Sequence, residues 1–160
     1  MTARSRSRPR EKWLNLGAGI HRPRGYINVD SVSLPGIDVV ADLDTGPWPW
    51  RAGEIGRIFA AHVFEHVAEP VLFMTEAWRI LAPGGELEIH VPYYKHWHAF
   101  TDPTHRRFCT EHTFDYWIAG TELHIKFGAA YRSPPSVFKL IRRTLANECE
   151  LQMRLEKLAS

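Results

Sequence analysis

The sequence predicts an α/β fold: a Rossmann-like, mostly parallel sheet with a terminal antiparallel strand, and shortened helices between the first strands. Short apolar runs recur along the 160 residues; the first stops at a glycine-rich turn and the second at an aspartate. Such runs, separated by loops or helices, are typical of a parallel sheet. With 44% hydrophobic residues the chain is long enough for one globular domain.

The first strand is expected at residues 12–16 and leads into Gly17-Ala18-Gly19. Glycine lets the backbone approach a ligand closely, and the second expected strand, residues 26–29, ends at Asp30, whose carboxylate can accept two ribose hydroxyls. A glycine pair alone also marks ordinary turns. Only 13 residues separate Gly17 from Asp30, so at most about one helical turn fits between the strands. This favours a ligand bound through its adenosine end over a pyrophosphate.

The segment Leu14-Asn15-Leu16-Gly17-Ala18-Gly19 resembles motif I of class I S-adenosylmethionine-dependent methyltransferases. It is most similar to a small-domain branch in which Leu-Asn-Leu-Gly-Cys-Gly precedes a Gly-aromatic-Ile-Asn-Val-Asp segment. Ala18 replaces the cysteine, and Asn15 stands where many members carry an acidic residue. The resemblance covers residues 12–117. It implies S-adenosylmethionine as the cofactor, bound by Asn15, Gly17, Ala18, Gly19 and Asp30.

A third buried-type run, residues 37–41, ends at Asp42-Leu43. In the resembling family an acidic residue at this strand end bonds the adenine amino group, so the resemblance assigns Asp42, with Leu43, to cofactor binding. The alternative is an aspartate that satisfies its own loop backbone.

The fourth expected strand, residues 57–61, breaks into His62-Val63-Phe64-Glu65-His66-Val67, which resembles the family's His-Val-Leu-Glu-His-Val segment. The resemblance places His62 beside the methionine half of the cofactor. Glu65 and His66 are interpreted as a polar pair that supports the turn.

Residues 46–50 hold two prolines and two tryptophans and should be irregular, with the tryptophans capping the sheet edge. A helix is predicted over 70–81, because Pro70 suits a first turn and Pro83-Gly84-Gly85 ends the apolar pattern. Residues 86–91 alternate and form the fifth strand. The turn before them resembles the family's Leu-x-Pro-Gly-Gly-x-Leu segment.

The loop after the fifth strand, residues 92–110, carries three histidines and an aspartate among five aromatic residues. It should overhang the carboxyl ends of the strands, where ligands bind in open α/β sheets. Within it, Asp102-Pro103-Thr104-His105-Arg106 resembles a segment that in the small branch is expected to face the methyl acceptor.

Three interpretations of this loop remain open. In the first, His98 or His105 deprotonates an acceptor hydroxyl and Asp102 orients the imidazole. In the second, His96, His98, Asp102 and His105 bind one divalent metal ion, although their spacing matches no standard site. In the third, these polar side chains only hydrogen-bond a lid over the cofactor. We favour the first and third over the metal site and predict no metal.

Four further elements are predicted towards the C-terminus. They are a helix over 111–119 capped by Thr110, a strand over 123–127, a helix over 135–146, and a final strand over 149–156. In class I methyltransferases the final strand inserts antiparallel beside strand six. A helix over 147–158 is the alternative.

The net charge of +2 comes from the first ten residues, which hold four arginines and no acid, whereas the remainder has 16 basic and 18 acidic residues. We predict a disordered basic tail at 1–10 and a single methyltransferase-like domain at 11–160. Nucleic-acid binding is not expected of the body. No run is long enough for a membrane span, and Cys109 and Cys149 have no paired spacing, so a reduced, cytoplasmic protein is expected.

The leading hypothesis is a methyltransferase that methylates an oxygen of a sugar or small metabolite with a histidine base. The Asp/Asn-Pro-Pro-aromatic tetrad of amino-methylating DNA enzymes is missing after the fourth strand. In a chain of 160 residues we expect no separate substrate domain, so acceptor binding could require a dimer or a partner protein. The alternatives are a non-catalytic cofactor-binding or partner subunit, and a metal-dependent hydrolase that uses the cluster at 96–105.

Overall fold

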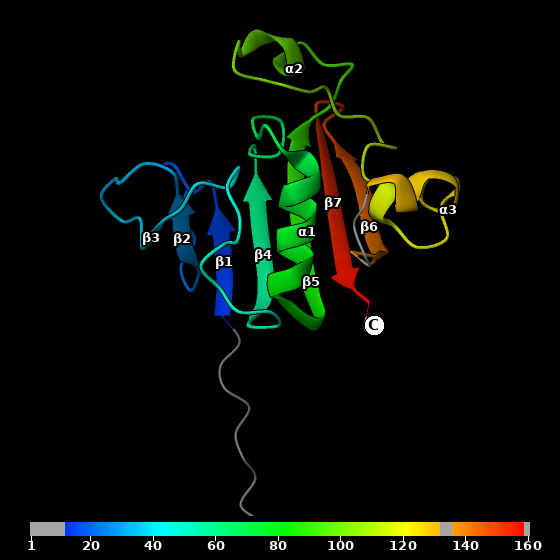
Figure 1. The fold of residues 1–160 in the computed structure, drawn as a ribbon. Coiled ribbons are helices and arrows are strands. Elements are labelled where there is room, and N and C mark those ends of the chain that lie inside the picture. The colour runs from blue at the N-terminus through cyan, green and yellow to red at the C-terminus, as the bar shows by residue number, and fades with distance from the viewer. Residues whose placement is uncertain (1–11, 132–135, 159–160) are drawn as a thin grey trace, which may run out of the picture.

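The structure is a computed structural model that describes residues 12–131 and 136–158. Its sheet has the strand order β3-β2-β1-β4-β5-β7-β6 (Figure 1). The strands are β1 (Lys12–Leu16), β2 (Ile27–Asp30), β3 (Val39–Val40), β4 (Ile55–Ala61), β5 (Leu81–Pro92), β6 (Phe138–Ala146) and β7 (Glu150–Lys157). The helices are α1 (Pro70–Ile80), α2 (His98–Thr101) and α3 (Glu122–Phe127), with 3-10 turns η1 (Asp115–Trp117) and η2 (Gly128–Tyr131).

The first five strands pair in parallel, and β7 pairs antiparallel with both β5 and β6. The predicted fold class, a mostly parallel sheet with a terminal antiparallel strand, is therefore confirmed. Because β1, β2, β4 and β5 run in the same direction, their carboxyl ends lie along one edge of the sheet. Ligands bind at this edge in open α/β folds.

One face of the sheet packs against α1, which lies over β4 and β5 (Figure 1). The buried side of α1 consists of Phe73, Met74, Ala77 and Ile80, together with the carboxylate of Glu76. Alternate residues of β4, β5 and β7 point to this face and are almost fully buried, so the core is continuous across the sheet.

The connections between the first four strands hold no helix in the described chain. The predicted shortening of these helices is confirmed. We call residues 46–50 the Pro-Trp loop, and both of its tryptophans are buried. Trp48 is 2% exposed and packs edge-on against Phe73, with 5.3 Å between the ring centroids. The loop thus serves as a wall of the core.

Two of the predicted strands have different bounds. The third strand is limited to Val39–Val40, because only two residue pairs connect it to β2. The fifth begins at Leu81, directly after α1, and residues 82–85 bulge out of the ladder where the pairing jumps from Leu81 to Glu86.

Three predictions at the C-terminal end were wrong. Residues 111–119 form turns around η1, because the Asp115 side chain binds His112 and Arg143. Residues 122–127 form α3, whose Thr121 side chain accepts a hydrogen bond from the His124 backbone N–H, 3.2 Å away, as an N-cap. That alternating segment has no partner among the strands of the described sheet.

The predicted helix over 135–146 is instead β6, from residue 138 onwards. It forms a long antiparallel hairpin with β7, and its turn residues Asn147 and Glu148 both have positive φ. The final strand is confirmed as β7. The predicted tail at 1–10 lies outside the described residues. No helix among those described has the length and apolar character needed to cross a membrane.

Candidate active site at the carboxyl ends of the strands

The chain turns sharply where β1 ends, and glycine is required there. Gly17 has a φ of +60°, and a Cβ at this position would lie 2.3 Å from a methyl carbon of Val63. After it, the Ala18 N–H donates to the Val29 carbonyl at 2.9 Å. The Gly19 N–H donates to the carboxylate of Asp30, also at 2.9 Å. The glycine turn and the end of β2 are thus held together as one unit.

This unit borders a pocket of about 160 Å³. The pocket is lined by Gly17, Asp30, Ser31, Asp42, Leu43, Asp44, Val63, His66 and Val67. Four of the predicted cofactor residues therefore meet at one site, with Ala18 and Gly19 in the adjoining backbone. Apolar walls and two carboxylates from neighbouring strand ends make it suitable for a nucleoside.

The two carboxylates are only partly satisfied by the protein. One oxygen of Asp30 accepts from Gly19 and the other from the Val32 N–H at 3.1 Å. Asp42 accepts from the Asp44 N–H at 2.9 Å and from the Thr45 hydroxyl at 3.0 Å. Each carboxylate oxygen can accept more than one hydrogen bond, so both groups retain capacity for ligand hydroxyl or amino groups.

Asn15 has a different place from the other predicted residues. Its side chain is buried, and its amide donates to the His21 carbonyl at 2.7 Å and to the Asn28 side chain at 3.0 Å. It does not line the pocket. Its contacts brace β1 against β2 beneath the glycine turn.

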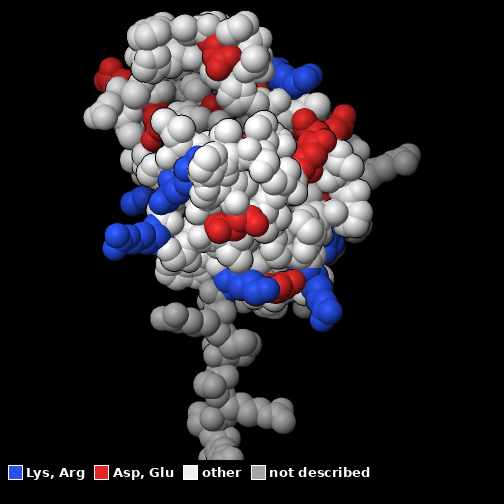
Figure 2. All heavy atoms as spheres, turned by 90° about the vertical axis from the view of Figure 1, so that its left-hand side faces the viewer, with Lys and Arg blue, Asp and Glu red and all other residues white. Residues whose placement is uncertain are grey.

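A larger cavity of about 770 Å³ lies beside this pocket, under the segment we call the flap (residues 93–110). The cavity is lined by His62, Glu65, His66, Pro92, His98, Thr101, Asp102, Pro103, His105, Cys149 and Glu150. His66 borders both pockets, so the two spaces adjoin. Figure 2 shows the flap as a lobe above the body of the domain with a hollow beneath it.

The flap is fastened to the turn that follows β4. The Arg106 N–H donates to the Glu65 carbonyl at 2.8 Å, and the Arg107 guanidinium donates to the Phe64 carbonyl. Tyr94 and Cys109 join the two ends of the flap through a backbone hydrogen bond of 3.0 Å. The flap thus has a defined position over the cavity.

The three predicted catalytic residues all line this cavity, but they do not form one triad. His98 is exposed on α2, whereas the side chain of His105 is 7% exposed and its Nδ1 lies 2.8 Å from the Ala99 carbonyl. Asp102 accepts hydrogen bonds from the backbone and hydroxyl of Thr104, and these contacts lower its pKa. Through Thr104 it reaches His66, whose Nδ1 is 2.9 Å from that hydroxyl.

His62 lines the larger cavity rather than the small pocket. It has a φ of +56°, an uncommon conformation for a residue with a side chain. Its Nδ1 is 3.4 Å from Glu65 and its Nε2 is 2.8 Å from Glu150. The contact with Glu65, and then that with Glu150, raise the pKa of His62 against the opposing effect of burial. The imidazolium form is thus favoured at the cavity rim.

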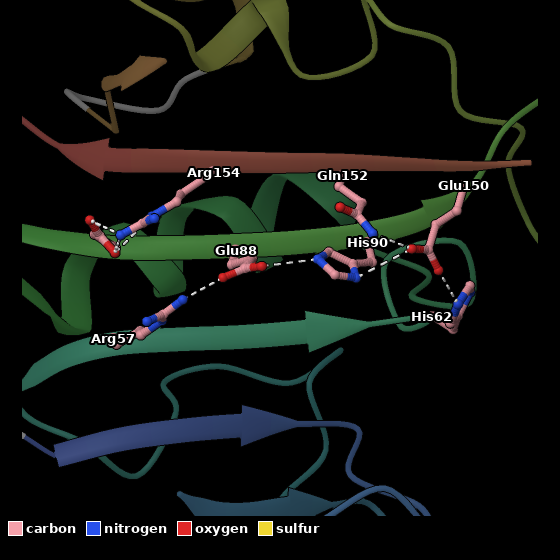
Figure 3. A network of polar contacts seen from close by, with 8 residues as sticks. Arg57, His62, Glu88, His90, Glu150, Gln152 and Arg154 are labelled. Carbon is pink, nitrogen blue, oxygen red and sulfur yellow. Dashed lines mark hydrogen bonds and ion pairs between the residues drawn. The ribbon is translucent and has the colours of Figure 1, made fainter. Parts of the chain in front are cut away.

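A ladder of polar side chains leads away from His62 across the sheet face opposite α1 (Figure 3). Glu150 lies 3.5 Å from His90, which in turn is 3.1 Å from Glu88. Glu88 ends the ladder in a 2.5 Å ion pair with Arg57. Acidic side chains alternate with histidine or arginine along it, so each carboxylate has a polar partner on this face of the sheet.

Several residues of the site had no clear signal in the sequence. Glu150 comes from β7, 88 residues from its partner His62, and Thr104 acts through its contact with His66. Cys149 lines the cavity at the start of β7, and both cysteines are free. Burial raises the pKa of Cys109 to about 12, so this thiol is not a nucleophile at neutral pH.

Comparisons with known proteins agree with this fold. Residues 24–89 match a family model described as "Methyltransferase domain". A S-adenosylmethionine-dependent methyltransferase from Thermotoga maritima superposes with a TM-score of 0.64 at 15% identity, over 93% of this chain and 83% of that chain. The fold is a methyltransferase fold.

Two further solved structures share this methyltransferase fold. One is a S-adenosylmethionine-dependent methyltransferase from Aquifex aeolicus, with a TM-score of 0.61, 13% identity and coverage of 92% and 82% of the two chains. The other is the 1,6-didemethyltoxoflavin-N1-methyltransferase from Burkholderia thailandensis, with a TM-score of 0.57, 15% identity and coverage of 92% and 71%. A comparison with curated protein sequences finds no match.

Proposed function

We propose that the chain is a S-adenosylmethionine-dependent methyltransferase that methylates an oxygen of a sugar or another small metabolite. The observation that supports this most is the adjacency of two pockets that share His66. The small pocket has the carboxylates and glycine turn that suit adenosine. The larger one is lined by histidines and has room for a hydroxylated acceptor.

The residues of the small pocket fit the cofactor that the methyltransferase match implies. Asp30 has lone pairs left for the ribose hydroxyls, and Asp42 for the adenine amino group. Leu43, Val63 and Val67 supply an apolar wall for a purine ring. When bound, S-adenosylmethionine supplies a methyl group on a sulfonium leaving group.

The chain contributes positioning, exclusion of water and a proton acceptor. The flap covers the cavity, and holding an acceptor there turns an encounter of two molecules into an aligned reaction. His98 and His105 are the candidate bases. His105 can donate from Nδ1 to the Ala99 carbonyl, which leaves Nε2 free to accept the hydroxyl proton. Asp102 accepts a hydrogen bond from the Thr104 hydroxyl, which in turn contacts His66. We therefore assign Asp102 the role of positioning Thr104 and His66.

A second candidate function is a non-catalytic cofactor-binding module or a subunit that needs a partner. Three large aromatic side chains of the flap are exposed: Trp97 at 63%, Phe100 at 60% and Phe108 at 49%. Phe100 and Phe108 stack on one another at 4.4 Å. Such a surface favours contact with another molecule, either an acceptor or a protein.

The metal-dependent hydrolase is not proposed. Of its four ligands at 96–105, only His105 belongs to a group that the described chain gathers tightly enough to hold an ion.

Replacing Asp30 by alanine should weaken S-adenosylhomocysteine binding by about 1.5–3 kcal/mol, the scale of hydrogen bonds to a charged group. The carboxylate is lost from the pocket, and so is the anchor of the Gly19 N–H. Calorimetry measures the affinity. The matched control is Glu54→Ala, which removes a carboxylate paired with Lys12 before β4, away from the pocket. Equal affinities for Asp30→Ala and the wild type would remove Asp30 from the ribose role.

Transfer of label from methyl-labelled S-adenosylmethionine to a panel of sugars and small hydroxylated metabolites tests the reaction itself. We expect one acceptor class to be labelled. Tight cofactor binding without labelling of any acceptor, alone or with added partner proteins, would favour the non-catalytic module.

A further inference from the structure

A buried carboxylate stands at the floor of the larger cavity. The side chain of Glu65 is 1% exposed, and it follows β4 on the turn that anchors the flap. Neither of its oxygens accepts a hydrogen bond from any residue in the described ranges. Burying a carboxylate without hydrogen bonds is costly, so an interaction with a cation is needed to offset the cost.

Two imidazoles face this carboxylate. One ligand atom each of Glu65, His66 and His105 lie within 4.8 Å of one another. His105 Nε2 is 4.0 Å from Glu65 Oε1, too long for a hydrogen bond. Ligand atoms held about 2.0–2.2 Å from one tetrahedral ion lie between three and four ångströms apart. The three ligand atoms here would therefore need to move only slightly closer together to bind one ion.

One ring nitrogen of each histidine, Nδ1, already has a protein partner. His105 Nδ1 is 2.8 Å from the Ala99 carbonyl, and His66 Nδ1 is 2.9 Å from the Thr104 hydroxyl. That hydroxyl donates to Asp102 at 2.7 Å, so it accepts from His66. Both rings therefore carry their proton on Nδ1 and keep an Nε2 lone pair. Metal-binding histidines are oriented in the same way by carbonyls and carboxylates behind them.

We infer that Glu65, His66 and His105 form a site for one divalent transition-metal ion, and we commit to zinc. Two imidazoles with one carboxylate are a common zinc ligand set, whereas magnesium and calcium prefer oxygen ligands. All three residues line the cavity, so the remaining coordination position is open to a small molecule. An open position is typical of a catalytic rather than a structural zinc site.

The main competing explanation is His62, whose Nδ1 lies 3.4 Å from Glu65. Its imidazolium could offset the buried charge from the rim. However, it is half exposed and shared with Glu150, and it is not hydrogen-bonded to Glu65. His96 on the flap is the second residue to compare in the binding test, because the sequence had suggested it as a metal ligand.

A role for the metal in catalysis rests on the proposed function. An ion at this site would bind the acceptor hydroxyl and lower its pKa, and His98 would then receive the proton, since His105 is a ligand. The site itself is independent of methyl transfer, and so is its test.

The test is calorimetric titration of the chelator-treated full chain with Zn²⁺. We expect one ion per chain, and we expect Glu65→Gln and His105→Gln each to weaken binding by more than about 100-fold, because even second-shell changes cost 10- to 100-fold. Thr104→Val should weaken it by about 10- to 100-fold. His112→Gln, at an exposed histidine that contacts Asp115 and does not line the cavity, is the matched control and should bind as the wild type does. Binding that survives Glu65→Gln, or that is lost in His96→Gln, overturns the site.

Thermal unfolding gives a second readout that a merely structural glutamate would not produce. Without metal, Glu65→Gln should have the higher Tm, because it removes a buried carboxylate whose oxygens accept no hydrogen bond in the described residues. With zinc, the wild type should have the higher Tm. A variant that is less stable or unfolded without metal shows that the carboxylate is structural and overturns the inference.

S-adenosylhomocysteine binding on the same preparations separates the two proposals. Cofactor binding without zinc binding overturns only the metal site. Zinc binding without cofactor binding overturns only the methyltransferase.

Discussion

Replacing Glu76 by alanine should lower the free energy of unfolding by about 3–5 kcal/mol, the usual cost of removing one partner from a buried ion pair. Glu76 is 6% exposed on α1 and accepts from the Trp48 N–H at 2.6 Å. The Arg79 guanidinium donates to it at 2.7 Å and also to the carbonyls of Trp48 and Trp50. This cluster joins the Pro-Trp loop to α1 in place of the missing helices, so its loss affects the whole core.

Urea unfolding at neutral pH measures this effect, and Glu69→Ala is the matched control. Glu69 is exposed, and its side chain forms no cap bond at the start of the same helix, so its loss should cost about 1 kcal/mol or less. Similar values for the two variants would show that the Glu76 cluster does not contribute to stability.

The same interaction should depend on pH. Burial by itself would raise the pKa of Glu76, but the hydrogen bonds from Arg79 and the Trp48 N–H lower it below its ordinary 4.5. The stabilisation is therefore fully present above about pH 4.5 and is lost as the pH falls through the lower pKa of the folded state. The stability difference between the wild type and Glu76→Gln should narrow over that acidic range.

Replacing Gly17 by alanine should lower the free energy of unfolding by about 2–5 kcal/mol. A left-handed backbone conformation costs a residue with a Cβ about 1–2 kcal/mol, and overpacking against Val63 adds about 1–3 kcal/mol. The new Cβ would lie 2.3 Å from Val63, so the glycine turn or the turn after β4 must move. Because both border the small pocket, cofactor affinity should fall as well.

Gly19→Ala separates the two contributions. Gly19 also has a positive φ, of +46°, but a Cβ there would meet nothing within 4 Å. Only the backbone cost of about 1–2 kcal/mol is then expected. Chemical denaturation measures the free energy of unfolding of both single variants. The same measurement on the double variant Gly17→Ala, Val63→Ala shows how much of the loss comes from the contact with Val63. Equal losses for the two single variants would contradict a close approach at Gly17.

The parallel half of the fold was predictable because local patterns and tertiary structure agree there. Buried strands, glycine turns and strand-end aspartates are all marked by residues near one another in the chain, and they define β1, β2, β4 and the small pocket. The C-terminal half was less predictable. An apolar spacing over 138–146 suits a helix or a strand, and pairing with β7 decides between them.

The larger cavity illustrates the same limit. The histidines of the flap were visible in the sequence, but their partners depend on how the flap docks. Glu65 was interpreted as a support for its own turn, whereas the structure places its carboxylate in the cavity with His66 and His105. Glu150 reaches His62 only because β7 inserts beside β5.

The central claim is that the pocket beside the glycine turn binds the adenosine of S-adenosylmethionine. A crystal structure of the chain grown with S-adenosylhomocysteine tests it most directly. The account predicts ribose hydroxyls on the Asp30 carboxylate, adenine between Asp42 and Leu43, and the sulfur end directed towards His66. Adenosine bound elsewhere on the chain, or no complex at millimolar ligand, would contradict it.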